Sequence, residues 1–407
     1  MRALPFLLTT LVLLAPHAAA DHVPKPARTA EELAVFHTWV TLTRDLQRMA
    51  AEHPDLMTLQ SIGKSVLGLD LWAVRLRAES DVPFEARERL YIDGGIHANE
   101  HLGMELALLY VTFLVEGHGK DENATWILEN RDTLVVPMVN PDGNLVDRRQ
   151  NARLVDMNRN FPYGWGGPGA SDTLGSSTYR GPSPGSEPEV QAVMRAIQAF
   201  DPDYSQSYHT GTTMLLHPWG GNDTALPDGP VYDRICQEFR RIEGSDRFPC
   251  GPVYSTIYPA TGGTVDFAYG VTGAISFTYE VDDLQTTPFS LEDLRERLRV
   301  PFEAQMQAFR DVHRYGSLPV LEDVFVEPSG DTQLLRVTVR NDGWLATNRT
   351  DLRIRALDEG VLLHEARLGR IEPGATATVE VVLPSTAQRL RFEADHDKNA
   401  LMPRAKV

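Results

Sequence analysis

Cysteine is scarce in this chain of 407 residues, which contains only Cys236 and Cys250. Two cysteines cannot supply the framework of several bridges that holds small secreted domains together. In an exported protein, two cysteines 14 positions apart pair more often than they bind a metal or act as nucleophiles. We therefore expect one disulfide between them.

Long apolar runs are also missing, except near the amino terminus. Within residues 1–20, Arg2 is followed by an uncharged apolar stretch and then by three alanines ahead of Asp21. This is the three-part layout of a secretory signal peptide, and its apolar centre is too short to span a bilayer. We predict a secreted or periplasmic protein without a membrane span. A membrane anchor at residues 1–20 is the alternative interpretation.

Basic residues are outnumbered in this sequence. It has 39 Lys and Arg against 56 Asp and Glu, for a net charge of −17, and loss of Arg2 with residues 1–20 makes this −18 (38 − 56). Such a charge repels nucleic acid and anionic membranes and favours solubility. The apolar content of 42% is ordinary for a globular protein, and there is no internal repeat. We expect a monomer with no nucleic-acid partner.

The most informative stretch is YIDGGIHANEH at residues 91–101. It begins like a buried strand, breaks at Gly94 and Gly95, and then presents His97 and Glu100 ahead of an apolar helix from about residue 102. An imidazole and a carboxylate this close suit Zn²⁺ as ligands. The pair alone is a weak signal, and its alternative is a histidine at a helix start beside a solvated glutamate.

Strand and helix patterns alternate over the first three quarters of the chain. An apolar run after Gly95 reads as a helix between two parallel strands, and this arrangement continues. We predict an α/β fold with a mixed, largely parallel sheet flanked by helices. Its expected elements are helices at 30–51, 102–117, 186–200 and 291–315, two strands around a turn within 57–76, and strands at 91–96, 133–139, 204–208 and 274–279.

The composition changes after Gly316. From there the chain has short alternating runs separated by Asn-Asp-Gly, Asp-Glu-Gly and Glu-Pro-Gly turns and no convincing helix. We predict a catalytic domain at 21–316 and a small all-β sandwich at 317–407, a solvated structural module rather than a binding domain. The expected strands are 335–339, 352–356, 376–382 and 389–394.

A third metal ligand follows from the topology. His209 lies at the end of the strand reading DYSQSYH, and strand ends in an open α/β sheet meet at the same crevice. His97, Glu100 and His209 would form a two-histidine, one-glutamate set with one coordination position left for water, which is the pattern of a catalytic zinc site. We therefore predict one Zn²⁺ per chain.

The chain resembles the zinc carboxypeptidase family typified by carboxypeptidase A over roughly residues 30–315. The resemblance rests on five ordered motifs: the HxxE pair at 97–100, DMNRNF at 156–161, His209, IYPATGG at 257–263 and FTYE at 277–280. It implies that Glu280 is the general base and that Asn158 and Arg159 bind the carboxylate of a peptide substrate. It also implies that Tyr258 closes over that peptide.

The resemblance assigns two further roles. An arginine nine residues before Asn158 stabilises the oxyanion in members with a short loop, which selects Arg149, with Arg148 and Arg153 as competing choices. Asp156 matches the family carboxylate that hydrogen-bonds a zinc-bound histidine and fixes its tautomer.

Substrate selection is expected from the position two after Gly263, where the chain has Val265. An apolar residue at the floor of the pocket would leave a buried cation unpaired, so we expect a preference for neutral, apolar or aromatic C-terminal residues. Alternatively, Val265 packs within a helix, and Asp223 or Asp228 lines the pocket.

Three functions fit these residues. The first is an exported zinc metallocarboxypeptidase, which Asn158, Arg159 and Tyr258 favour. The second is a peptidase of the same family acting on the stem peptides of peptidoglycan. The third is a non-catalytic binding module, against which Glu280 argues, because a binding protein does not need a general base there.

Overall fold

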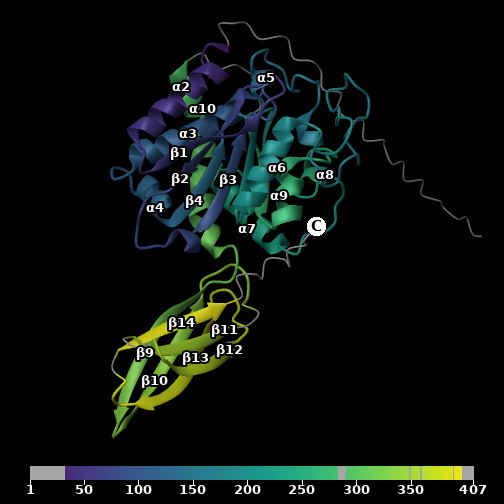
Figure 1. The fold of residues 1–407 in the computed structure, drawn as a ribbon. Coiled ribbons are helices and arrows are strands. Elements are labelled where there is room, and N and C mark those ends of the chain that lie inside the picture. Colours follow the sequence, from purple (N-terminus) through teal and green to yellow (C-terminus); the bar gives the residue numbers. More distant parts are fainter. Residues whose placement is uncertain (1–32, 283–289, 348–349, 358–359, 388, 397–407) are drawn as a thin grey trace, which may run out of the picture.

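The computed structural model describes residues 33–282, 290–347, 350–357, 360–387 and 389–396. The predicted signal peptide at 1–20 lies outside these ranges. In Figure 1 a large unit of helices around a central sheet is followed by a smaller unit built from strands. Across the described ranges, none of the helices combines the length and the apolar character that crossing a bilayer requires.

The large unit contains an eight-stranded mixed sheet. β3 pairs in parallel with β4 and β5, β5 with β8, and β6 with β7, whereas the remaining pairs are antiparallel. The predicted fold class is therefore confirmed. In spatial order the strands are β1 (Met57–Lys64), β2 (Asp70–Leu76), β4 (Arg131–Val136), β3 (Glu88–Gly94), β5 (Tyr204–His209), β8 (Ile275–Asp282), β6 (Thr212–His217) and β7 (Cys250–Pro252).

Helices surround this sheet (Figure 1). Thr38 caps α2 and Ser290 caps α10 through side-chain oxygens that accept backbone N–H groups. The α-helices are α2 (Trp39–Glu52), α3 (His101–Gly117), α4 (Glu122–Asn130), α5 (Pro141–Asn144), α6 (Pro188–Phe200), α7 (Gly229–Ile242), α8 (Val253–Thr256), α9 (Thr264–Thr272) and α10 (Leu291–Asp311), and the 3₁₀ helices are η1 (Phe84–Ala86), η2 (Met157–Arg159) and η3 (Val312–Arg314).

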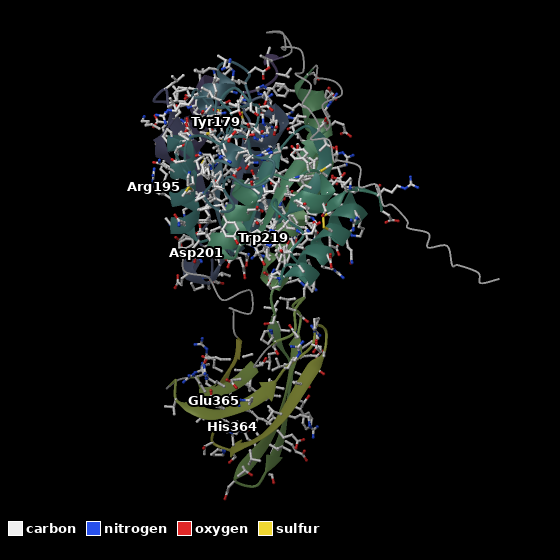
Figure 2. The ribbon with its side chains drawn as sticks, turned by 90° about the vertical axis from the view of Figure 1, so that its right-hand side faces the viewer. Tyr179, Arg195, Asp201, Trp219, His364 and Glu365 are labelled. Carbon is white, nitrogen blue, oxygen red and sulfur yellow. A yellow bond between two sulfur atoms is a disulfide. The ribbon has the colours of Figure 1, made fainter. Side chains whose placement is uncertain are left out.

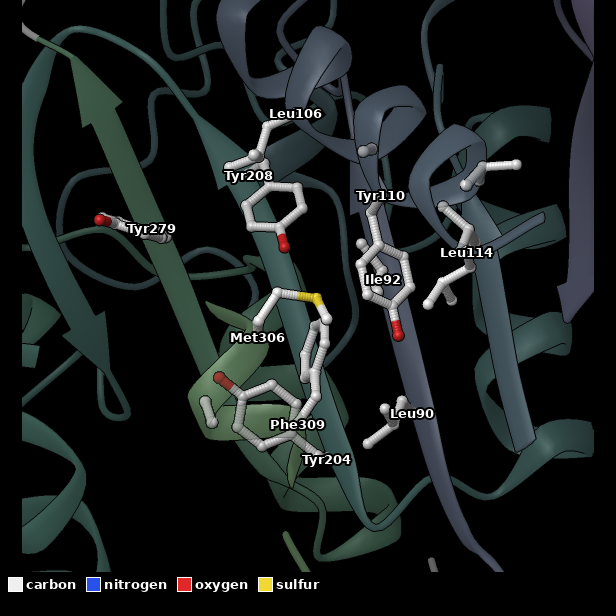
Figure 3. Packing of buried hydrophobic residues seen from close by; sticks show 14 of the residues in the cluster. Leu90, Ile92, Leu106, Tyr110, Leu114, Tyr204, Tyr208, Tyr279, Met306 and Phe309 are labelled. Atoms are coloured by element: carbon white, nitrogen blue, oxygen red, sulfur yellow. The ribbon is translucent and has the colours of Figure 1, made fainter. Parts of the chain in front are cut away.

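The core lies on both faces of the sheet. Successive residues of a strand point to opposite faces, so Leu90 and Ile92 pack in one hydrophobic cluster and Tyr91 in another. Figure 3 shows the first cluster, in which Tyr110 of α3 and Phe309 of α10 pack beside β3. Burial on both faces explains the apolar runs at 90–92 in β3 and at 134–136 in β4.

The small unit consists of two three-stranded antiparallel sheets, ordered β13-β10-β9 and β12-β11-β14. Its core is formed by inward residues such as Leu335 and Ile354. In Figure 2, His364 and Glu365 mark β12 in this unit. The strands are β9 (Pro319–Ser329), β10 (Thr332–Asn341), β11 (Thr350–Ala356), β12 (Leu362–Gly369), β13 (Thr376–Pro384) and β14 (Leu390–His396).

Some predicted boundaries were wrong. The strand expected at 133–139 ends at Val136, because Pro137 has no N–H group for the next ladder bond. The helix expected to reach residue 315 ends at Asp311 and continues as η3. The α-helices and strands that were not predicted are α4, α5, α7, α8, β6, β7, β9 and β12, and α9 was considered only as the helix in which Val265 alternatively packs.

Candidate metal centre and active site

The three predicted metal ligands meet at the carboxyl ends of β3 and β5. β3 ends at Gly94, where a Cβ atom would lie 2.8 Å from the carbonyl oxygen of Gly103, so only glycine permits this approach of α3. The turn that follows delivers His97 and places Glu100 at the start of α3. His209 is the last residue of β5, which pairs in parallel with β3.

The ligand atoms of this set face one another. His97 Nδ1 lies 3.0 Å from Glu100 Oε1, His209 Nδ1 lies 2.8 Å from Glu100 Oε2, and the two Nδ1 atoms are 3.1 Å apart. Among the described residues, this is the group of His, Cys, Asp and Glu side chains whose ligand atoms all lie within 4.8 Å of one another. The side chains of His97 and His209 are almost completely buried.

The hydrogen bonds of the two imidazoles assign their tautomers. His97 Nε2 lies 3.0 Å from Asp156 Oδ1, and an ionised carboxylate only accepts, so Nε2 carries the proton. His209 Nε2 lies 3.3 Å from Ser207 Oγ, whose own proton goes to Asp93 Oδ1 at 2.6 Å. A metal bound by Glu100 and the two rings requires these tautomers, in which the Nδ1 atoms present lone pairs beside the Glu100 carboxylate.

This donor set fits a cation. Two nitrogen lone pairs and a carboxylate point at one another with no proton between them, an arrangement that a positive ion relieves. Burial lowers the pKa of His209, which favours the neutral ring that a metal requires. His97, Glu100 and His209 are thus the residues that could hold a metal here.

Asp156 and Arg149 contact the three proposed metal ligands and each other. Arg149 donates from Nη1 to Glu100 Oε1 at 3.0 Å and from Nη2 to Asp156 Oδ2 at 2.9 Å. Burial opposes the charge on Asp156, but the guanidinium of Arg149 and the ring of His97 hold the pKa of this carboxyl well below its usual value. An ionised Asp156 can therefore accept a hydrogen bond from His97 Nε2.

The ligands open into a cavity of about 310 Å³. Glu280 lies across from His209, because the two residues are register partners in β5 and β8. Every predicted catalytic, metal-binding and substrate-binding residue lines this cavity: His97, Glu100, Arg149, Asn158, Arg159, His209, Tyr258, Val265 and Glu280.

Asn158 and Arg159 sit on η2, directly after Asp156. Asn158 Oδ1 accepts from the backbone N–H of Thr264 at 3.0 Å, which directs its amide group. Arg159 donates from Nε to the carbonyl of Gly169 at 3.0 Å and from Nη1 to that of Asn158 at 2.9 Å. Backbone carbonyls therefore fix the guanidinium without neutralising its charge.

The competing arginines lie elsewhere. Arg148 is exposed and does not line the cavity. Arg153 has a half-exposed side chain 3.7 Å from Glu187. Of the three, Arg149 is the one that reaches the cavity and the ligands.

One side of the cavity is apolar. Leu216, Val253 and Val265 form a buried cluster against which Met214, Ile257 and Ala260 pack. The acidic alternatives do not contribute to this wall: Asp223 is exposed, and Asp228 is buried where Tyr269 Oη donates to it at 2.8 Å.

Comparison with known proteins agrees with this geometry. Residues 42–300 match the sequence profile described as zinc carboxypeptidase. The chain belongs to the zinc carboxypeptidase family. Membership implies zinc, and the set of His97, Glu100 and His209 supplies suitable ligands for it.

Named carboxypeptidases are similar to this chain, which spans less than two thirds of the length of the carboxypeptidases A1 and A2 that it matches. Mouse (Mus musculus) carboxypeptidase A2 is 30% identical over 268 residues, which cover 61% of this chain and 63% of the mouse protein. Bovine (Bos taurus) carboxypeptidase B is 28% identical over 323 residues, or 73% of each chain. A crystal structure of thrombin activatable fibrinolysis inhibitor shares the fold, with a TM-score of 0.62, 24% identity, and coverage of 72% of this chain and 78% of that one.

Ser207 and Asp93 were not predicted from the sequence. Both are buried polar residues on central strands, and Ser207 lies two positions before His209 on the same face of β5. That spacing was the available signal. The partner of Ser207 on β3 became visible only through strand pairing.

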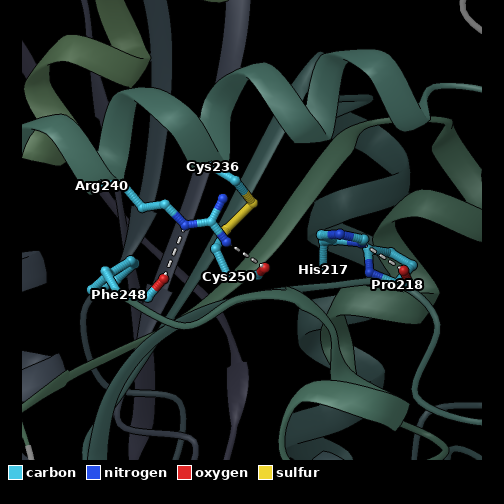
Figure 4. The surroundings of a disulfide bond; sticks show 6 residues. All are labelled: His217, Pro218, Cys236, Arg240, Phe248 and Cys250. Atoms are coloured by element: carbon cyan, nitrogen blue, oxygen red, sulfur yellow. Dashed lines mark hydrogen bonds between the residues drawn. A yellow bond between two sulfur atoms is a disulfide. The ribbon is translucent and has the colours of Figure 1, made fainter. Parts of the chain in front are cut away.

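The two cysteines form a disulfide between α7 and the start of β7 (Figure 4). Arg240, also on α7, donates to the carbonyls of Phe248 at 3.2 Å and Cys250 at 3.3 Å. β7 is an edge strand that leads directly into α8, whose Val253 lines the cavity. The disulfide thus anchors the segment that precedes the tyrosine-bearing loop.

Proposed function

We propose that this chain is an exported, monomeric zinc carboxypeptidase that removes residues from the C-termini of peptides. The observation that carries the proposal is the placement of His97, Glu100 and His209 in one cavity with Glu280 and with the guanidinium of Arg159. One zinc ion per chain, held by the three ligands, supplies Lewis acidity for the scissile carbonyl and for the attacking water.

Glu280 acts as the general base in this proposal. It lies next to His209 across the β5 and β8 pairing and lines the cavity that the metal ligands also line. It takes a proton from that water and passes it to the leaving amine. Arg149 contributes positive charge where the oxyanion develops, and its contacts with Glu100 and Asp156 fix its position.

Asn158 and Arg159 make the proposed enzyme an exopeptidase. An amide donor beside a planar guanidinium matches the two oxygens of a terminal carboxylate, which an internal peptide bond lacks. Tyr258 lines the same cavity and would close over the bound peptide. An endopeptidase does not need this pair.

The apolar wall supports a preference for neutral C-terminal side chains. Val265, Leu216 and Val253 offer no charge to a lysine or arginine side chain, which would lose its hydration without gaining a partner. Aliphatic or aromatic side chains would bury apolar area there instead.

The test measures zinc content and kcat/KM on blocked dipeptides ending in Phe, Leu, Lys, Arg or Glu. We expect one zinc per chain and values for Phe and Leu at least about tenfold above those for Lys and Arg, equivalent to about 1.4 kcal/mol. Arg or Lys ranking first would overturn the apolar preference. Cleavage confined to peptidoglycan stem peptides would favour the cell-wall alternative, and zinc binding without any cleavage would favour a binding module.

A further inference from the structure

The loop that carries Tyr258 is held at both ends by one short segment, residues 218–221. At one end the backbone N–H of Tyr254 donates to the carbonyl of Trp219 at 3.0 Å. At the other end the N–H of Ala260 donates to the carbonyl of Gly220 at 2.8 Å. Residues 218–221, which we call the strut, therefore set the height of the loop above the cavity.

Asp266 holds the strut in turn. The N–H of Gly220 donates to both carboxylate oxygens of Asp266 at 3.0 Å. Asp266 lies in the first turn of α9, directly after Val265, and is 3% exposed. The ring of Trp219, labelled in Figure 2, stacks on Tyr163 with centroids 5.0 Å apart. The strut is thus tied to the helix that forms the floor of the substrate pocket.

Gly220 leaves no room for a side chain. A Cβ atom there would lie 2.0 Å from the carbonyl oxygen of Ala260 and 3.2 Å from Asp266 Oδ2. Any larger residue would push the end of the loop away from the strut. The backbone of Ala260 can therefore approach residue 220 this closely only because that residue is glycine.

Burying Asp266 costs more free energy than burying an apolar side chain at the same position would. Among the described residues, no cationic side chain lies within ion-pair distance of it. Burial raises the pKa of Asp266 to about 7, a rise that the N–H of Gly220 and the more distant charge of Arg159 only partly offset. The carboxylate of Asp266 accepts hydrogen bonds from the N–H of Gly220 and is therefore bonded to the strut.

We propose that Asp266, acting through Gly220, is a positioning residue for the tyrosine loop and thereby for Tyr258. Asp266 does not line the catalytic cavity and acts only through the strut. The role of Tyr258 in this inference rests on the proposed function. The restraint of the loop by Asp266 and Gly220 does not.

Three substitutions test the restraint. Asp266→Leu removes the acceptor, Asp266→Asn keeps an acceptor oxygen, and Gly220→Ala forces the loop outward. Gly229→Ala is the matched control, because a Cβ atom at Gly229 meets nothing within 4 Å. Amide hydrogen exchange of residues 254–262 should be at least about tenfold faster in Asp266→Leu and Gly220→Ala, and near wild type in Asp266→Asn and the control. Unchanged exchange in Asp266→Leu and Gly220→Ala would overturn the proposal whatever the enzyme hydrolyses.

A double-mutant cycle tests the action through Tyr258. With full zinc content, Asp266→Leu should lower kcat/KM about tenfold, mainly through KM, while Asp266→Asn restores it. In a Tyr258→Phe background the same substitution should cost less than twofold, because the phenol that it mispositions is already gone. An undiminished tenfold loss in that background would overturn the link to Tyr258. Absence of hydrolysis in the wild-type protein would instead count against the proposed function, and the exchange measurement would still judge the restraint.

Discussion

At the centre of the site, hydrogen-bond acceptor atoms of three side chains face one another. His97 Nδ1, His209 Nδ1 and the Glu100 carboxylate meet within hydrogen-bond distance, and the protons on the rings point outward to Asp156 and Ser207. Such an arrangement costs free energy unless a cation occupies its centre. The residues behind the ligands therefore matter for metal binding as much as the ligands do.

Removing one ligand should remove the metal. We expect His209→Ala to lose stoichiometric zinc, because two ligands from one turn cannot complete a tetrahedral site. Metal analysis of the purified protein checks this. His364→Ala, on β12 of the small unit, is the control and should retain zinc. Full zinc occupancy in His209→Ala would refute the ligand assignment.

The charge of Glu280 can be removed without changing its shape. Glu280→Gln should keep zinc and bind substrate but lose turnover by about 10² to 10⁴, because an amide cannot accept the proton of water. Steady-state kinetics together with zinc analysis separate this from a binding defect. Turnover near that of the wild-type protein would exclude Glu280 as the base.

Asp266 gives stability a predictable dependence on pH. Because burial raises its pKa from 3.8 to about 7, the folded state keeps a proton that the unfolded state releases, and stability falls as pH rises from about 4 through about 7. Asp266→Asn has no such proton to release. Its Tm should therefore rise relative to wild type between pH 5 and pH 8, and thermal unfolding at both values measures this. A constant difference would contradict the raised pKa.

At the scale of elements, the edge strand β7 depends on its attachment to α7. The disulfide closes a loop with a sequence separation of 14, and a loop of about that size contributes roughly 3 kcal/mol in the chain-entropy account. Replacing both Cys236 and Cys250 by serine should lower the free energy of unfolding by about this amount. Thermal unfolding with and without reductant tests it: reductant should destabilise the wild-type protein and leave the double variant unchanged. An equal response of both proteins would contradict the prediction.

At the scale of the whole molecule, the two units are in contact through the segment between β10 and β11. The backbone N–H of Trp344, between β10 and β11, donates to the carbonyl of Arg314 at 2.8 Å, and its ring packs against Tyr315 with centroids 4.9 Å apart. Arg234 of α7 lies over the same ring. All proposed catalytic residues belong to the large unit, so the small unit supports it from outside the site.

Deleting residues 321–407 should therefore leave hydrolysis of small peptides within about twofold of wild type, since each unit has its own core. The truncated protein should unfold at a lower temperature, because Tyr315 loses the ring of Trp344. Trp344→Ala in the full chain is the matched control and should reproduce part of that loss. A truncated protein that is folded but inactive would show that the small unit takes part in catalysis.

Local sequence patterns were enough to predict the alternation of strands and helices and to select the residues proposed as metal ligands. Apolar runs of strand length, the glycine break before His97 and the strand-end position of His209 follow from local patterns that survive in the folded chain. These patterns also predicted that His97 and His209 would meet, because parallel strands share an edge. Local pattern does not distinguish Arg149 from Arg148 and Arg153, since three arginines in one loop look alike, and only the spacing implied by the family resemblance selected Arg149.

The pairing of buried polar groups could be seen only in the folded chain. The bond from Ser207 to Asp93 joins residues 114 positions apart, and the strut joins Gly220 to Asp266 and Ala260. A hydrogen bond has no sequence period, unlike burial on one face of a helix or strand, so no local pattern announces such partners. The same holds for β7, whose three residues are too few to show a strand pattern and which is placed by its disulfide and its register with β6.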